Sequence, residues 1–172
     1  MNSALPPGYS LRLGDRLDRA LLVKFMQRTY QEFDPAAPTG HLALTVEQYF
    51  SNETPLWWVE TVPELPLDGP SLRQTRRSAA IACLWMGTAI DQTWGDRHAH
   101  IFLLYVDPAH RRQGIGAALM HQAEQWAKHR GDRQIGLQVF CHNQPALALY
   151  QKLGFQTHSL WMTKSLEMPC EH

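Results

Sequence analysis

A glycine-rich turn at residues 111–117 is the stretch whose residue types and spacing point most directly to chemistry. It reads RRQGIGA and follows an apolar stretch that ends in Val-Asp-Pro. Glycines let a backbone approach a ligand closely, and the free N–H groups at the start of a helix bind anions, above all phosphates. Two arginines add positive charge. The turn therefore predicts a cradle for a phosphate or pyrophosphate; the alternative is a glycine-rich turn that binds nothing.

Two known phosphate-binding patterns do not fit this turn. The nucleoside-triphosphate loop requires GxxxxGK[ST], which does not occur in the chain. The dinucleotide fingerprint requires a third small residue where Leu119 stands. Binding of ATP or NAD is therefore the less favoured reading of the cradle.

A second informative stretch covers residues 143–155. Its apolar residues follow helical spacing, which places Tyr150 at the edge of a buried stripe. A buried phenol needs a partner for its hydroxyl, and near a leaving thiolate it could act as the acid. The alternative is a tyrosine that only packs in the core.

The elements that must position these stretches alternate between strands and helices in the second half of the chain. We expect strands at 9–13, 56–62, 79–88, 98–106, 134–140 and 155–166, and helices at 16–33, 46–51, 114–130 and 145–153. Asp15 and Thr45 are the expected helix caps, and 63–77 is expected to be a loop. This order predicts an α/β fold with a mixed sheet flanked by helices, in a single domain over residues 1–172.

The two stretches together resemble the GCN5-related N-acetyltransferase (GNAT) superfamily. The resemblance rests on R-R-x-G-x-G-A after a strand ending V-D-P, and on N-x-x-A-x-x-L-Y-x-x-x-G-F further on. It implies a splayed mixed sheet with acetyl-CoA in the split between the 100–106 and 134–140 strands. The cofactor-binding core would span about 98–156, and acceptor-side elements would span about 15–62. The implied reaction is direct attack of a primary amine on acetyl-CoA, which needs no Ser or Cys nucleophile.

The resemblance also implies roles for single residues. Backbone groups at 104–106 would pair with the pantetheine arm and the acetyl carbonyl, and the 111–117 turn would hold the pyrophosphate. Asn143 would contact the cofactor through its side chain, and Tyr150 would protonate the departing thiolate. The implied cofactor-binding set is Leu104, Tyr105, Val106, Arg111, Arg112, Gln113, Gly114, Ile115, Gly116, Ala117 and Asn143.

The sequence leaves the identity of the general base open. Relatives that acetylate protein N-termini carry a glutamate where this chain has Gln138, which cannot accept a proton at neutral pH. Glu60 is our candidate, acting through water, with His98 and His100 as alternatives. The two histidines share a strand face but have no third ligand at a convincing spacing, so we expect no metal.

Composition and charge exclude several classes of protein. The chain has 172 residues, 44% hydrophobic and 19% charged, which excludes a disordered chain. Lys plus Arg and Asp plus Glu are 16 each, so a nucleic-acid partner is not expected. Apolar runs fall short of the roughly 20 residues of a membrane span. Three cysteines without a CxxC motif fit a reducing compartment, and we expect a cytoplasmic protein, leaving open whether it forms a homodimer.

The charges are unevenly distributed along the chain. Residues 31–70 contain no Lys or Arg but seven acidic residues: Glu32, Asp34, Glu47, Glu53, Glu60, Glu64 and Asp68. Such a stretch could attract a cationic amine of a small molecule or peptide, or it could simply keep the surface solvated. The resemblance to the GNAT superfamily implies an acetyl-CoA-dependent N-acetyltransferase. The rival is a non-catalytic acyl-CoA-binding sensor of the same fold, which would have no need of the Tyr150 phenol.

Overall fold

The computed structural model describes residues 4–62, 78–91, 93–164 and 166. The chain forms two compact units, Met1–Gln138 and Val139–His172. The loop expected at 63–77 lies outside the described residues. The single domain over 1–172 stays a prediction.

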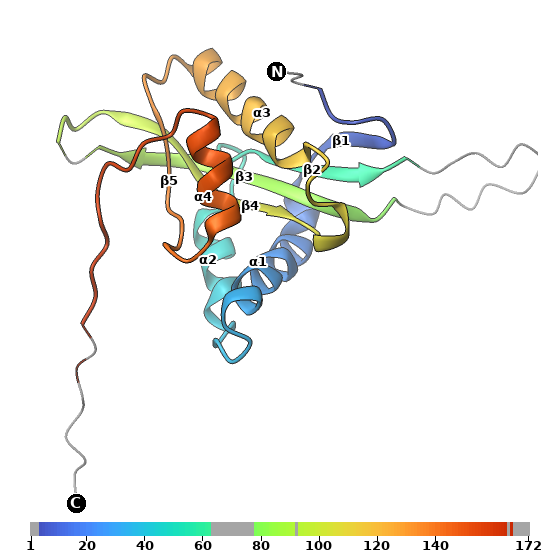
Figure 1. Cartoon of the computed structure of the whole chain (residues 1–172), viewed down its shortest axis with the longest axis horizontal. Coiled ribbons are helices and arrows are strands. Elements are labelled where there is room, and N and C mark those ends of the chain that lie inside the picture. The colour runs from blue at the N-terminus through green and yellow to red at the C-terminus, as the bar shows by residue number, and fades with distance from the viewer. Residues whose placement is uncertain (1–3, 63–77, 92, 165, 167–172) are drawn as a thin grey trace, which may run out of the picture. The chain divides into compact units, whose positions relative to one another are not determined.

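The larger unit is built on one five-stranded mixed sheet (Figure 1). Its strands lie in the order β1 (Tyr9–Leu13), β2 (Leu56–Thr61), β3 (Ala80–Ile90), β4 (Arg97–Val106) and β5 (Ile135–Leu137). Neighbours from β1 to β4 are antiparallel, and β5 is parallel to β4. The predicted mixed α/β class is confirmed, but β5 is much shorter than the expected 134–140.

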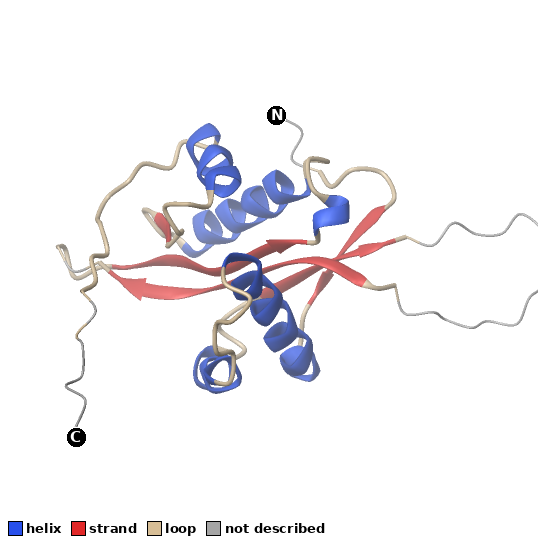
Figure 2. Ribbon diagram, turned by 60° about the horizontal axis from the view of Figure 1, so that its bottom comes forward, coloured by secondary structure: helices blue, strands red, loops and turns tan. Residues whose placement is uncertain are grey.

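Helices cover both faces of this sheet (Figure 2). On one face lie α1 (Arg19–Phe33) and α2 (His41–Tyr49), and on the other lies α3 (Ile115–Arg130). The core under α1 and α2 is a single cluster of buried residues: Leu22, Phe25, Met26, Leu42, Val46, Phe50, Leu56, Trp58, Cys83, Trp85, Leu103 and Tyr105. β3 is buried on both faces from Ile81 to Gly87, which explains its almost continuous apolar sequence.

Local signals set the ends of the helices. Asp15 begins the first helical segment as expected, since its carboxylate accepts from the Leu17 N–H at 2.7 Å. That segment opens with a 3₁₀ turn, Arg16–Asp18, before α1. α3 ends at Gly131, whose φ of 80° lets its N–H reach the last carbonyls of the helix.

Two sequence expectations are wrong. α2 begins at His41 rather than at 46, because Leu42 and Val46, one helical turn apart, are both buried; Thr45 lies inside the helix and donates to the His41 carbonyl at 3.2 Å. The strand expected at 155–166 is not formed by residues 155–164 or 166. Alternating side chains make a strand only where a partner strand pairs with the backbone.

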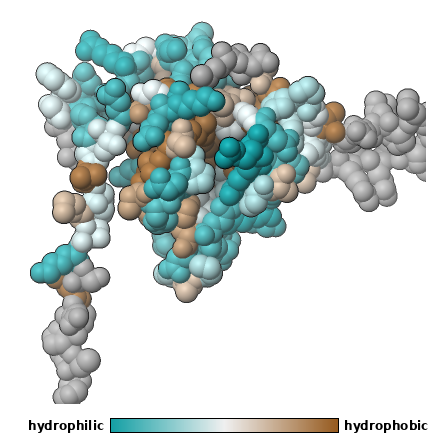
Figure 3. All heavy atoms as spheres, viewed as in Figure 1, coloured by the Kyte–Doolittle hydropathy of each residue, from teal (hydrophilic) through white to brown (hydrophobic). Residues whose placement is uncertain are grey.

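The smaller unit contains α4 (Gln144–Lys152), close to the expected 145–153. The segment that follows carries hydrophobic side chains in solvent (Figure 3). Leu160, Trp161 and Met162 are each at least 80% exposed.

Candidate active site

The edge of β4 that faces β5 is open over the residues predicted to meet the cofactor. The parallel pairing of β4 with β5 covers only Ala99↔Ile135, His100↔Gly136 and Ile101↔Leu137. β4 continues to Val106, still paired with β3 on its other side. Backbone groups of residues 104–106 therefore have no β5 partner, which is the splayed arrangement expected from the sequence.

The turn after β4 presents backbone donors. Arg112 has a φ of 63° and Gly114 a φ of 88°, so the chain takes the left-handed conformation twice just before α3. The first helical bond of α3 runs from the Ala118 N–H to the Gly114 carbonyl at 3.0 Å. The N–H groups of Ile115, Gly116 and Ala117 thus have no partner within the helix and are available to an anion.

The two arginines of this turn have different surroundings. Arg111 donates to both carboxylate oxygens of Glu32 on α1 at 2.7 Å and to the Val106 carbonyl at 2.8 Å. Arg112 is exposed and makes no hydrogen bond or ion pair with any residue that the structure describes. Of the pair, Arg112 has the guanidinium that is free to meet a phosphate.

Tyr9 of β1, which is far from the turn in the sequence, contacts it through hydrogen bonds. The Tyr9 hydroxyl donates to Gln113 Oε1 at 2.8 Å and lies 2.8 Å from His110 Nδ1. Sequence reasoning missed this contact, and also the Glu32–Arg111 pair, because both join residues far apart in the chain.

Glu60, the predicted base, lies on β2 in an ion-pair network. Its Oε1 accepts from Arg12 Nε at 2.7 Å, and the same guanidinium contacts the Asp18 carboxylate at 2.9 and 3.1 Å. Burial alone would raise the pKa of Asp18, but Arg12 and the Asp15 N–H hold that pKa below its ordinary value. The Asp18 hydrogen bond, followed by that of Glu60, raises the pKa of Arg12 against the effect of burial.

The two candidate histidines lie on β4 beside an irregularity in the sheet. The register between β3 and β4 passes from Trp85↔Leu103 to Met86↔Ile101, so Phe102 is an extra residue in β4. The Phe102 ring lies against Gly87, where a Cβ would collide with it. Its centroid is 5.4 Å from that of His100 and 4.8 Å from that of Trp85. The lone glycine in the apolar β3 sequence was the signal for this close approach.

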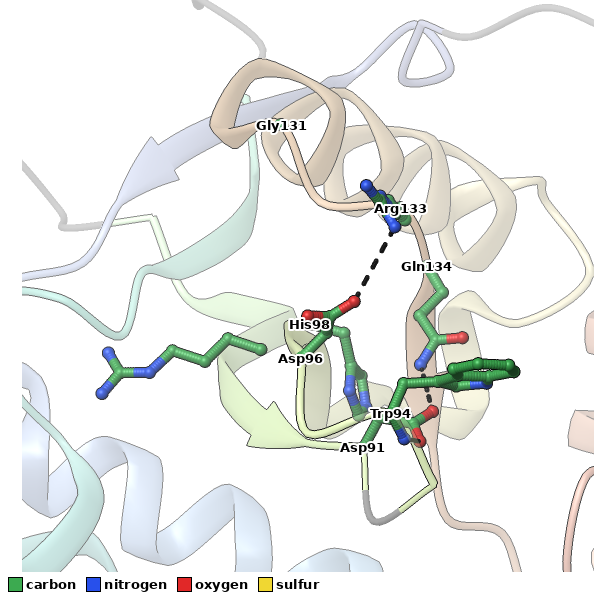
Figure 4. Close-up of a pocket in the computed structure, with 8 residues that line it drawn as sticks. Asp91, Trp94, Asp96, His98, Gly131, Arg133 and Gln134 are labelled. Atoms are coloured by element: carbon green, nitrogen blue, oxygen red, sulfur yellow. Dashed lines mark hydrogen bonds and ion pairs between the residues drawn. The ribbon is translucent and has the colours of Figure 1, made fainter.

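His98 also lines a polar pocket of about 600 Å³ (Figure 4). It is lined by Asp91, Trp94, Asp96, Arg97, His98, Gly131, Arg133 and Gln134. Two polar contacts join residues that line this pocket. Gln134 donates to Asp91 at 2.7 Å, and Arg133 lies 3.8 Å from Asp96. Trp94 is 81% exposed here, whereas Trp58 and Trp85 are buried in the core.

The smaller unit carries the other two predicted residues. Asn143 caps α4, with its side-chain oxygen accepting from the Ala146 N–H at 3.2 Å. Its amide NH₂ makes no hydrogen bond within the described residues and can still donate to a ligand. Tyr150 packs against Phe155 with ring centroids 5.7 Å apart, and burial raises its pKa to about 12.

A family model described as acetyltransferase (GNAT) family matches residues 25–155, more than half of the chain. The chain belongs to this family. Among its relatives, the mycothiol acetyltransferase of Amycolatopsis mediterranei is 35% identical over 121 residues, which cover 67% of the chain and 37% of that protein. Human N-acetyltransferase 8 is 30% identical over 118 residues, which cover 64% of the chain and 42% of that protein. The matches thus span less than half of each relative.

The fold of this GNAT member is also found in solved structures. A predicted acetyltransferase from Clostridium acetobutylicum, crystallised with acetyl-CoA, superposes with a TM-score of 0.66 at 20% identity. The match covers 91% of this chain and 96% of that one. Acetyltransferases of the GNAT family use acetyl-CoA.

The residues of this GNAT member fit an anionic cofactor. The start of α3 offers backbone donors and the free Arg112 guanidinium, and a side chain at Gly114 would have to adopt a left-handed backbone. Over the described ranges, no three His, Cys, Asp or Glu side chains are grouped to hold a metal ion. No helix among the same residues has the length and apolar character needed to cross a membrane.

Proposed function

We propose that this GNAT member transfers an acetyl group from acetyl-CoA to a primary amine of a small molecule or peptide. The supporting observation is the start of α3, where unpaired backbone N–H groups and the free guanidinium of Arg112 directly follow the open edge of β4. The names of the relatives, a mycothiol acetyltransferase and an N-acetyltransferase, agree with this class of reaction.

Different residues of the chain have different roles in this reaction. Bound acetyl-CoA supplies the thioester that the amine attacks. The turn at 112–117 binds the pyrophosphate, the backbone of 104–106 aligns the pantetheine arm, and the Asn143 amide donates to the cofactor. Alignment of the two reactants is itself a large part of such catalysis. Tyr150 gives a proton to the leaving sulfur, for which its high pKa is suitable because the phenol stays protonated at neutral pH.

Calorimetry with coenzyme A tests the cofactor site. Arg112→Glu reverses the free charge at the turn and is expected to weaken binding by tenfold or more. Arg19→Glu, a matched change at an exposed arginine of α1, is expected to leave the dissociation constant unchanged. Equal affinity of the two variants for coenzyme A would contradict cofactor binding at this turn.

Thiol release from acetyl-CoA in the presence of a panel of primary amines tests the activity. We expect amine-dependent release that Tyr150→Phe suppresses. Tight binding of acetyl-CoA without release for any amine would instead support a non-catalytic acyl-CoA sensor.

A further inference from the structure

His98 and His100 share one face of β4, because alternate residues of a strand point the same way. Their ring centroids are 6.4 Å apart. Both rings lie over Gly136 of β5: a Cβ on that glycine would be 3.2 Å from His98 Nε2 and 3.7 Å from His100 Nδ1. The absence of a side chain at Gly136 therefore leaves the space that the two imidazoles use.

His100 lies where the sheet opens. Its pairing with Gly136 is followed by only one more pair, Ile101↔Leu137, before β4 continues without β5. The next residue of β4 is the extra residue Phe102, whose ring contacts His100 on one side and Tyr49 of α2, 5.8 Å away, on the other. His100 thus lies on the α1/α2 face, four residues before Leu104, the first of the β4 residues expected to meet the pantetheine arm and the acetyl group.

The chemical state of His100 suits a proton acceptor. Neither ring nitrogen is hydrogen-bonded to a residue that the structure describes, so a lone pair is free. Burial first, and the nearby His98 second, lower the pKa of His100 below its ordinary value of 6.5, which keeps the ring neutral at pH 7. Tyr49 of α2 contacts the same Phe102 ring that packs against His100. Asp91, Asp96, Arg97 and Arg133 line the pocket around His98.

We propose that His100 takes the proton of the acceptor amine, and that His98, which shares the space over Gly136 with it, is a positioning residue. The proposal rests on the proposed function. As the bond from nitrogen to the acetyl carbon forms and the carbon–sulfur bond breaks, the N–H proton moves to a ring nitrogen of His100. The sulfur leaves with a proton from Tyr150, so charge and protons balance. Glu60 is less suited to this role, because Arg12 engages its carboxylate.

Histidine titration by NMR on the full chain tests the resting state without relying on activity. The His100 signal, assigned by its loss in His100→Gln, is expected to titrate below pH 6.5. In His98→Gln the midpoint is expected to rise, because the electrostatic effect of His98 that lowers the pKa of His100 is removed. His129→Gln, which changes an exposed histidine at the end of α3, is the control and should shift nothing. A His100 midpoint at or above 6.5, unmoved by His98→Gln, would overturn the proposal.

The pH profile of kcat/KM tests the role in the reaction. In the wild type we expect activity to fall on the acid side as His100 becomes protonated. His100→Gln should lower kcat/KM by about 10²–10⁴-fold and remove that acid limb, with coenzyme A affinity unchanged. His98→Gln should move the limb to higher pH while retaining activity at alkaline pH.

The outcomes separate this proposal from the proposed function. If amines are acetylated and His100→Gln, folded by circular dichroism, keeps both its rate and its acid limb, the base is another group although the enzyme assignment stands. If acetyl-CoA binds and no amine is acetylated, both are wrong. A loss of coenzyme A affinity equal to the loss of rate would make His100 a structural residue and also overturn its role as base.

Discussion

Tyr150, the proposed general acid, has an environment that keeps its phenol protonated. A phenol in water ionises near pH 10, and burial moves the pKa of Tyr150 to about 12. It therefore stays protonated over the whole neutral range, as an acid for a departing thiolate must. The same burial would also suit a tyrosine that only packs against Phe155, so the distinction requires a kinetic measurement.

Tyr150→Phe keeps the ring and removes the proton. We expect kcat to fall by about 10²–10⁴-fold, the usual contribution of general acid catalysis, while coenzyme A affinity stays nearly unchanged. Initial rates of thiol release and calorimetry on the same preparation measure the two effects. A kcat within twofold of the wild type would mean that water or another group protonates the sulfur.

At the scale of elements, Tyr9 attaches the proposed cofactor turn to β1. Tyr9→Phe removes the hydroxyl that contacts His110 and Gln113, both at 2.8 Å. A hydrogen bond contributes about 1 kcal/mol, so we expect the dissociation constant of coenzyme A to rise about fivefold per bond lost. Calorimetry measures it. Tyr49→Phe is the control, since its hydroxyl has no hydrogen-bond partner among the described residues, and an equal effect of both changes would contradict the attachment.

The contact of β3 with the extra residue of β4 gives a second prediction at this scale. Gly87→Ala places a methyl group into the Phe102 ring at a buried position of β3. Such overpacking costs about 1–3 kcal/mol, which urea unfolding would detect as a lower free energy of unfolding. Gly40→Ala, at an open position with ordinary backbone angles, should change little. Equal stability of the two variants would mean that β4 adjusts freely.

Local rules explain which elements the sequence predicts well. β1 and the ends of α3 follow from alternation, from the glycine turn and from Gly131, all of which act within a few residues. The start of α2 does not follow from such local signals, because it depends on the burial of Leu42. The false strand at 155–166 has the same cause, because strand pairing is a long-range property that a single segment does not encode.

The candidate site likewise has features that the sequence predicts and features that only the structure shows. Motifs read along the chain predict the backbone donors at 115–117, because helix geometry alone makes them available. They cannot show that Glu32 engages Arg111, that Arg12 engages Glu60, or that Gly136 makes room for two histidines. These contacts depend on β pairing and helix packing. They favour His100 over Glu60 as the proposed base.

At the scale of the whole molecule, a net charge of zero conceals local pairing. Of the acidic residues at 31–70, Glu32 and Glu60 are paired with Arg111 and Arg12. Glu64 and Asp68 lie outside the described residues. Glu47 on α2 and Glu53 after it are exposed and form no ion pair with the described residues. The attraction that the stretch exerts on a cation would thus come in part from these two.

A cationic acceptor should therefore be sensitive to salt. Exposed charges are screened beyond about 10 Å at 0.1 M ionic strength, so we expect kcat/KM for a cationic amine to fall several-fold between 20 mM and 300 mM salt. Glu47→Gln should lower kcat/KM at low salt and flatten this dependence. Glu124→Gln, which removes a carboxylate from α3 on the other face of the sheet, should not. Steady-state rates with a panel of amines measure both effects. A best substrate that is anionic, or a kcat/KM for cationic amines that does not change with salt, would show that the carboxylates only solvate the surface.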